Sequence, residues 1–314
     1  VGAVLSPPLY CSEATSQHDP RSIVYYVTGT GWRSQQSCSV KYDGETDQTR
    51  LMMPNRYTQA LVKYRGPFVL AIIRLVLVTI FIIISALVGL LICLVRPFYV
   101  PNVALFSSWY GWSAWIFGLK VEVRQSAEVT AAMPCVFLAN HQNNYDLFTI
   151  SKALLPGTVT IGKKSLKWIP FFGQLYWLSG NILIDRANKS KAVGTMQGAV
   201  DRIVQDKVSV WVFPEGTRSY GRGLLPFKTG AFHIAQQAKV PLVPICMSNT
   251  GKVRLNKWNN GRVIIEIMPP IYPAAGTPAR ELAETIRQQM ADKIKLLDSE
   301  VATDYPADSL TVTG

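Results

Sequence analysis

The sequence predicts an α/β fold: a single domain with a largely parallel or mixed central sheet, preceded by membrane-associated helices at its N-terminal side. Two observations carry this prediction. From about residue 121, short apolar runs of strand length alternate with segments of helical periodicity, which is the pattern of an α/β domain. Ahead of this region, the chain from Leu75 to Val95 contains no charged residue, and a helix of that length reaches the ~30 Å of a bilayer core.

Strands are expected where short apolar runs are bounded by polar residues, Gly or Pro. They are 135–139, 158–162, 181–184, 208–213, 242–247 and 262–268. Between them, apolar residues from Ala192 to Val204 recur with the helical period, and a final amphipathic helix is expected from about Pro278 to Ser299. The domain is expected to cover residues 120–301, with 302–314 as a tail.

Residues 66–119 are expected to form a membrane anchor, with an apolar helix at about 68–95 and an interfacial helix at about 104–119. Arg74 and Arg96 bracket the uncharged run, and the long Arg74 side chain could snorkel to an interface. The second helix is rich in Trp, Tyr and Phe, which favour headgroup depth. The pair could span the bilayer or enter one leaflet and return, since basic residues lie on both sides.

Residues 1–55 differ from the rest of the chain. They are rich in Ser, Thr, Gln and Gly and lack sustained periodicity, so we expect a disordered leader. One hypothesis is that the native protein starts at Met52 or Met53. The intact mass of the native protein tests it, and a mass that includes Val1 contradicts it.

The net charge of +12 indicates an anionic partner: nucleic acid, an anionic membrane surface, or a phosphorylated or CoA-type substrate. The five cysteines are scattered, without a C-x-x-C pair. Cys93, Cys135 and Cys246 lie in apolar runs and are expected to be reduced, buried thiols. This usage fits a protein that faces the cytosol better than a disulfide scaffold.

His141 is the histidine placed for chemistry among the three in the chain. His18 lies in the polar leader and His233 in an apolar helical repeat, whereas His141 follows a strand-like run. If a helix begins shortly afterwards, Asp146 lies in its first turn and can bind the imidazole, fix its tautomer and stabilise the imidazolium. An isolated H-x-x-x-x-D pattern is more often a helix cap with a local loop bond, so the later segments decide between the two.

Two arginines follow other predicted strands. Arg186 and Arg218 offer planar forks of donors that suit phosphate oxygens, and Gly216 allows a turn that exposes backbone N–H groups to an anion. A lone arginine at either place would more simply pair with Asp185 or Glu215. Further positive charge comes from Lys163, Lys164 and Lys228.

Four segments together resemble the signature blocks of the glycerolipid acyltransferases. They are NHQNNYD (140–146), GNILIDR (180–186), FPEGTRS (213–219) and VPLVPI (240–245). The sequence between these blocks is similar to that of the bacterial 1-acyl-sn-glycerol-3-phosphate acyltransferases, and the resemblance runs from about Val69 to Val301.

The resemblance implies transfer of a fatty acyl group from acyl-CoA or acyl-carrier protein to the sn-2 hydroxyl of lysophosphatidic acid, which gives phosphatidic acid. It implies His141 as general base and Asp146 as its orienting partner. The residues expected to bind the acceptor and its phosphate are Arg186, Glu215, Gly216, Thr217, Arg218, Lys163 and Lys228. The acyl-side or structural group is expected to be Asn140, Pro214, Pro241 and Pro244. No metal or other cofactor is required, nucleic acid is not expected as a partner, and the implied location is the bacterial inner membrane with the site facing the cytoplasm.

The sequence also allows other functions. Within the enzyme class, the acceptor could instead be glycerol 3-phosphate or another lysophospholipid. A non-catalytic membrane phospholipid-binding protein would explain the anchor and the charge but leave the His141–Asp146 pair without a role. The G-x-S-x-G elbow of a serine hydrolase is absent. The phosphate-loop pattern from Gly157 to Ser165 is rejected because Lys164, not Ser or Thr, follows its lysine.

Overall fold

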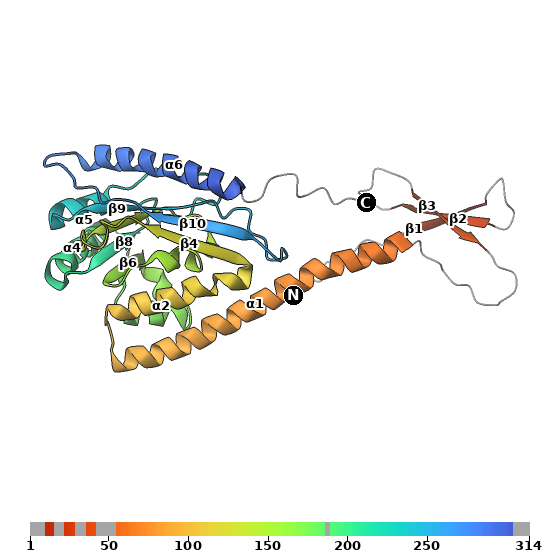
Figure 1. The fold of residues 1–314 in the computed structure, drawn as a ribbon. Coiled ribbons are helices and arrows are strands. Elements are labelled where there is room, and N and C mark those ends of the chain that lie inside the picture. Colours follow the sequence, from red (N-terminus) through yellow and green to blue (C-terminus); the bar gives the residue numbers. More distant parts are fainter. Residues whose placement is uncertain (1–9, 16–21, 29–35, 42–54, 186–188, 304–314) are drawn as a thin grey trace. The chain divides into compact units, whose positions relative to one another are not determined.

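The computed structural model describes residues 10–15, 22–28, 36–41, 55–185 and 189–303. The chain divides into two compact units, residues 1–66 and 67–314 (Figure 1). The first unit contains an antiparallel sheet of β1 (Tyr10–Thr15), β2 (Ser22–Thr28) and β3 (Gln36–Lys41). These strands lie inside the segment expected to be a disordered leader, whose other residues up to 54, like the C-terminal tail after 303, lie outside the described part of the chain. The start-site hypothesis stays a prediction.

The second unit is built on a seven-stranded sheet in the order β4-β10-β9-β5-β8-β6-β7. Its strands are β4 (Leu119–Gln125), β5 (Val136–Ala139), β6 (Thr158–Lys163), β7 (Ile182–Ile184), β8 (Ser209–Val212), β9 (Leu242–Met247) and β10 (Gly261–Ile267). From β9 to β7 neighbouring strands are parallel, and β10 runs antiparallel to β9 but parallel to β4. The predicted mixed, largely parallel α/β sheet is confirmed.

Two apolar layers cover the sheet because side chains alternate between its faces. On β5, Val136 and Leu138 point into a cluster with α4 (Lys189–Asp206), α5 (Gly230–Ala238) and α6 (Ala279–Thr303). Phe137 and Ala139 point into the opposite cluster, which contains residues of α2 and of the short helices that follow it. Figure 1 shows α4, α5 and α6 on one side of the sheet and α1 and α2 on the other.

Each of the six predicted strands is confirmed to within two residues, and the predicted helices at 192–204 and 278–299 correspond to α4 and α6. The edge strand β4 was missed. Its sequence, LKVEVRQ, alternates apolar and charged residues, a pattern of period two that predicts a half-exposed strand. The prediction instead extended the preceding aromatic helix to residue 119. The short helical pieces are η1 (Ser113–Phe117), η2 (Asn144–Leu147), η3 (Ile150–Ala153), η4 (Lys164–Trp168) and α3 (Phe172–Leu178).

The predicted apolar helix corresponds to α1 (Asn55–Val95), of which Phe68–Val95 is long and apolar enough to cross a membrane. One face of α1 packs on the protein: Ala86 and Cys93 are buried in a cluster with Phe106 of α2 (Pro101–Trp112) and Leu175 of α3. The other face exposes large apolar side chains. They include Ile72, Ile73, Ile80, Ile84, Leu87, Leu91 and Leu94.

Only some of the aromatic rings in the helix expected at headgroup depth are exposed. Phe106, Tyr110 and Phe117 are buried in the protein, whereas Trp112 and Trp115 are 67% and 54% exposed. The expectation was wrong for the three buried rings: Tyr110 and Phe117 fill the layer beneath the sheet, and Phe106 packs against residues of α1 and α3. An aromatic-rich sequence alone does not separate packing against protein from packing against lipid.

Arg74 does not reach out to an interface. It is buried, and its guanidinium group donates to the carbonyls of Leu255 at 2.9 Å, Lys257 at 2.6 Å and Trp258 at 2.7 Å. The chain turn after η1 fits closely beside this contact, because Gly118 has a φ of +69° and a Cβ there would collide with the Trp258 carbonyl. Beyond the other end of the apolar run, the Phe98 N–H donates to the Leu178 carbonyl at 2.7 Å. The apolar segment therefore contacts the α/β unit near both of its ends.

Candidate active site

The polar segments picked out in the sequence meet at one edge of the sheet. Strands β5, β6, β8 and β9 run parallel, so their carboxyl ends lie together. His141 comes two residues after β5, Phe213 directly follows β8, and Met247 ends β9. This is the edge where open α/β sheets bind their ligands.

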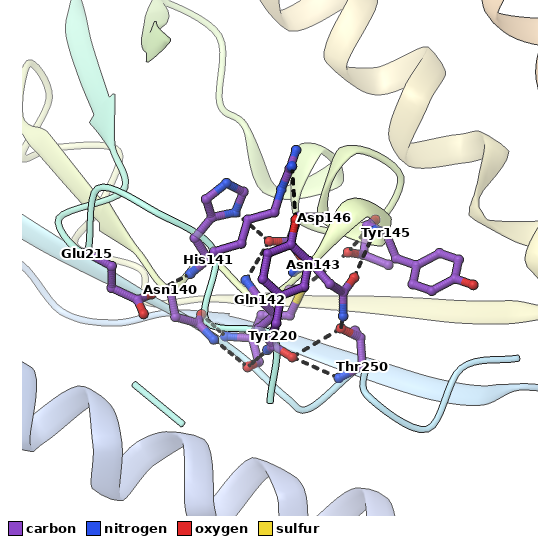
Figure 2. Close-up of polar contacts among 12 residues, drawn as sticks. Asn140, His141, Gln142, Asn143, Tyr145, Asp146, Glu215, Tyr220 and Thr250 are labelled. Atoms are coloured by element: carbon purple, nitrogen blue, oxygen red, sulfur yellow. Dashed lines mark hydrogen bonds and ion pairs between the residues drawn. The ribbon is translucent and has the colours of Figure 1, made fainter. Parts of the chain in front are cut away.

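The His141–Asp146 pair has the predicted geometry (Figure 2). Asn143 caps η2 and Asp146 closes its capping box. One carboxylate oxygen of the buried Asp146 lies 2.6 Å from His141 Nδ1 and accepts the Gln142 N–H at 2.6 Å; the other accepts the Asn143 N–H at 3.2 Å. Since an ionised carboxylate only accepts hydrogen bonds, the proton belongs on Nδ1 and the lone pair on Nε2.

Phe213 fixes the plane of the His141 ring. The two rings stack with their centroids 4.1 Å apart and their planes 21° from parallel. The His141 side chain is 20% exposed, so a substrate can reach the ring although its orientation is held. No sequence pattern predicts this contact, because an aromatic residue at a strand end carries no mark of a stacking partner.

Glu215 braces the loop from within. It is 4% exposed, and its two oxygens accept the N–H groups of His141 at 2.7 Å and Leu225 at 2.9 Å. Burial raises the pKa of this carboxyl group. The expected role in contacting the acceptor does not fit this placement, because both oxygens point at backbone. Glu215 holds His141 in position, and the Ser219 N–H assists by donating to the His141 carbonyl at 2.8 Å.

The residues around His141 are tied to the end of β9. Asn140 is buried and exchanges two hydrogen bonds with the Met247 backbone, at 3.0 and 2.9 Å. Gln142 donates to the Met247 carbonyl and accepts from the Thr250 N–H, both at 2.9 Å, while the Asn143 amide donates to the Thr250 hydroxyl at 2.7 Å (Figure 2). Asn140 therefore has the structural role, and Gln142, Asn143 and Thr250 are supporting residues that the sequence prediction missed.

A basic group lies in the turn after β8. Gly216 has a φ of +70°, and a Cβ at that position would come within 2.8 Å of Lys228 Nζ. Arg218 is half-buried. Its Nε is buried and has no hydrogen-bond partner among the described residues, and its contact through Nη1 to the Tyr220 hydroxyl is long, at 3.4 Å. Thr217 is exposed between them. Two cationic groups with donors to spare suit an anionic ligand.

The remaining basic residues singled out in the sequence are Arg186, Lys163 and Lys164. Arg186 falls outside the described residues. Lys163 is exposed at the end of β6, which β8 separates from β5, and Lys164 lies 3.8 Å from Asp185 as an ion pair. The segment from 157 to 165 is largely strand β6, which agrees with its rejection as a phosphate loop.

The three prolines have structural places. Pro214 is buried and its carbonyl accepts the Lys228 N–H. Pro241 precedes β9 and its carbonyl accepts the Val136 N–H, at the start of β5. That is the sheet edge opposite His141, which agrees with the structural alternative expected for Pro241. Pro244 is buried inside the sheet beside Leu138.

Comparison with known proteins shows the family of the chain. Residues 120–248 match the acyltransferase family. The 1-acyl-sn-glycerol-3-phosphate acyltransferases of Salmonella typhimurium and Escherichia coli are each 50% identical to this chain over 236 residues, which cover 74% of the chain and 96% of each relative. The chain belongs to the 1-acyl-sn-glycerol-3-phosphate acyltransferase family. The family resemblance noted in the sequence is confirmed.

The fold of this acyltransferase is also found among solved structures. The crystal structure of the 1-acyl-sn-glycerophosphate acyltransferase from Thermotoga maritima superposes with a TM-score of 0.59 at 21% identity, and the match covers 76% of this chain and 98% of that one. At this level of identity, the likeness extends to the fold.

A small cavity of the acyltransferase lies beside the His141 loop but is not lined by His141. Its volume is about 100 Å³, and its walls include Asn140, Gln142, Ser219, Asn249 and Asp298. It has room for a few water molecules and not for an acyl chain. Within residues 55–185 and 189–303, no three His, Cys, Asp or Glu side chains are grouped as metal ligands.

Proposed function

We propose that the protein transfers a fatty acyl group from a thioester to the sn-2 hydroxyl of lysophosphatidic acid, which yields phosphatidic acid. The names of its relatives support this acceptor and product. The single observation that supports the chemistry is the 2.6 Å contact between His141 Nδ1 and Asp146, because it directs the basic Nε2 toward a substrate at the sheet edge.

In the proposed mechanism, Nε2 takes the hydroxyl proton while the oxygen attacks the thioester carbonyl. An alcohol is a weaker acid than an imidazolium ion by about 9 pKa units, so the proton leaves during the attack and not before it. The tetrahedral intermediate then collapses, the C–S bond breaks, and the imidazolium returns the proton to the thiolate. General-base help of this kind contributes about 10²–10⁴-fold, and no acyl-enzyme is needed.

The backbone N–H groups at and beside His141 already donate to carboxylates. Glu215 accepts the N–H of His141, and Asp146 accepts those of Gln142 and Asn143. These three donors are therefore not available to the oxyanion of the intermediate. Their role in the proposal is to hold the base, and the remaining acceleration comes from donors elsewhere at the edge and from holding the two substrates together.

We assign the phosphate of the acceptor to the turn that carries Arg218 and Lys228. Arg218 has a buried Nε without a partner in the described protein, and Lys228 Nζ lies over Gly216. A phosphate held here would neutralise both cations. The alternative of a lone surface ion pair for Arg218 is disfavoured by the burial of Glu215, whose oxygens are occupied by backbone.

We further propose that α1 lies within one membrane leaflet of the bacterial inner membrane, with the active site facing the cytoplasm. From Arg74 to Val95, the end of α1, the helix is about 32 Å long, and the α/β unit contacts the chain near both ends of this stretch. A helix that crossed the ~30 Å core would carry part of the polar domain into that core. Placement in one leaflet avoids this cost.

The test of the proposal is acyl transfer by the detergent-purified protein. Lysophosphatidic acid and glycerol 3-phosphate are offered as competing acceptors, with oleoyl-CoA and oleoyl-acyl-carrier protein as donors in separate reactions. We expect phosphatidic acid as the product. Formation of lysophosphatidic acid from glycerol 3-phosphate would instead assign the enzyme to the first acylation step, and no product from either acceptor would contradict the proposal.

A further inference from the structure

The segment after β6 exposes an unusual number of aromatic side chains. Trp168 is 73% exposed, Phe171 46% and Trp177 44%. They lie within ten residues of one another on η4, α3 and the turn between these helices. Scattered exposed apolar residues are ordinary, but a contiguous group of large rings marks an interaction surface.

Direct contacts join this group to the end of α1. The Phe98 ring packs edge-on against Trp177 with centroids 5.4 Å apart, and the Phe98 N–H bonds to the Leu178 carbonyl. Phe98 is itself 50% exposed, and Leu94, near the end of α1, is 72% exposed. The exposed apolar residues at the end of α1 are therefore linked to the aromatic group through Phe98.

A lysine lies among the rings. Lys167 Nζ is 5.0 Å from the ring centroid of Trp168 and 5.6 Å from that of Trp177. These are cation–π distances. Such a lysine presents its ammonium group beside aromatic rings, which matches the boundary between acyl chains and anionic headgroups. We call Phe98, Lys167, Trp168, Phe171 and Trp177 the aromatic–basic patch.

The backbone presents two of these rings at a conformational cost. Phe98 has a φ of 57° and Phe171 a φ of 64°, a region that residues other than glycine rarely adopt. Both side chains remain about half exposed. Strained positions that gain no burial within the protein fit a contact made outside it.

We propose that the aromatic–basic patch is a second membrane-contact surface, which inserts its rings at the headgroup boundary of an anionic leaflet. The link to the apolar face of α1 favours a lipid surface over an acidic carrier protein. A carrier protein would be bound mainly by basic side chains, whereas this patch exposes four aromatic rings and one lysine. The patch begins beside Lys163, at the carboxyl end of β6. It therefore brings the sheet edge that carries His141 toward the leaflet that holds the acceptor.

Site-directed nitroxide labels test the depth of the patch without requiring turnover, so that failure of this inference and failure of the proposed function are distinguishable. Trp168→Cys and Phe171→Cys are labelled in the full chain with Cys11→Ser and Cys38→Ser, since Cys93, Cys135 and Cys246 are buried. Leu94→Cys provides the lipid reference. Tyr272→Cys provides the water reference, because Tyr272 is 68% exposed and follows Ile271, which pairs with Leu242 at the opposite sheet edge.

In phosphatidylglycerol–phosphatidylcholine proteoliposomes, we expect labels at 168 and 171 to be protected from a water-soluble nickel complex and accessible to oxygen, as at 94. Accessibility to nickel equal to that at 272 would overturn the proposal. Protection that appears only after acyl-carrier protein is added would overturn it too, since the surface would then bind protein.

A second variant tests the charge of the patch and rests on the proposed function. Lys167→Gln should raise the apparent KM for lysophosphatidic acid in anionic vesicles about fivefold, the contribution of one lysine near such a surface. It should leave kcat and the KM in neutral detergent micelles unchanged. Lys295→Gln, which is exposed on α6, is the matched control. An equal rise in micelles, or none in vesicles, would contradict a role at the membrane.

Discussion

At the scale of single residues, Asp146 does more than orient the catalytic histidine: it also holds the backbone of the loop around it. It orients His141 through Nδ1 and also accepts the backbone N–H groups of Gln142 and Asn143. The loop that carries the base is thus folded around one buried carboxylate. Fixing the tautomer and fixing the loop are the same interaction.

Asp146→Asn is expected to lower kcat by about 10²–10⁴-fold. The amide has one oxygen in place of two, and its NH₂ group would face N–H donors and favour the wrong imidazole tautomer. The measurement is kcat at saturating acceptor. Asn144→Ala, at an exposed neighbouring position, is the control, and equal rates for the two variants would contradict the role of Asp146.

Glu215 predicts a particular pH dependence of stability. Burial raises the pKa of Glu215 above its usual 4.5, so the folded chain takes up this proton at a higher pH than the unfolded chain does. Its contribution to the free energy of unfolding is therefore largest below about pH 4.5 and is lost as the pH rises through the raised pKa. The free energy of unfolding of the unmutated protein minus that of Glu215→Gln should fall between pH 4.5 and 7.

Denaturant unfolding in detergent at the two pH values measures this difference. Glu284→Gln is the control, because the hydrogen bond from Arg287 lowers the pKa of the exposed Glu284 and the sign of the effect is reversed. A difference for Glu215 that grows with pH would contradict the account.

Arg218→Lys is expected to raise the KM for lysophosphatidic acid by roughly 10–100-fold, the cost of about 1.5–3 kcal/mol for a lost charge-assisted hydrogen bond. A lysine keeps the charge but lacks the planar fork. Arg287→Lys, in an exposed ion pair with Glu284 on α6, is the control. An unchanged KM would remove Arg218 from the phosphate site.

At the scale of elements, Arg74 connects α1 to the loop that precedes β10. Its guanidinium group satisfies three backbone carbonyls between residues 255 and 258 at 2.9 Å or less. The carbonyls of Leu255 and Trp258 would lose this donor if the side chain were shortened or made apolar, and that of Lys257 would keep only the longer bond from the Asn260 amide at 3.2 Å. The contact is therefore a joint between the apolar helix and the α/β domain.

Arg74→Met should lower the free energy of unfolding in detergent by at least about 1.5–3 kcal/mol. Arg96→Met is the matched control, since Arg96 brackets the other end of the same run but is exposed. Thermal unfolding of both variants makes the comparison. A larger loss for Arg96→Met than for Arg74→Met would contradict the joint.

The elements also show what sequence patterns can and cannot determine. Period and strand length located β5, β8 and β9, and the spacing from His141 to Asp146 predicted the pair, because these are local properties of the chain. The burial of Arg74 and the brace made by Glu215 depend on segments more than 70 residues away. No local pattern specifies such contacts, and the same holds for the stacking of Phe213 on His141.

At the scale of the whole molecule, the chain combines a net charge of +12 with an exposed apolar face on α1. Positive charge draws a protein to an anionic surface, and apolar side chains hold it there. The sheet edge with His141 and Arg218 then needs to face the same surface, since both the acceptor and the product of the proposed reaction are membrane lipids. The aromatic–basic patch supplies that orientation.

The central claim is that Nε2 of His141 removes the proton from the acceptor hydroxyl. Single-turnover acyl transfer to lysophosphatidic acid, measured for the unmutated protein and for His141→Ala, tests it most directly. We predict that the rate of the variant falls by about 10²–10⁴-fold, while its affinity for lysophosphatidic acid, which depends on Arg218 and Lys228, is retained. An unchanged rate in a folded variant would contradict the mechanism.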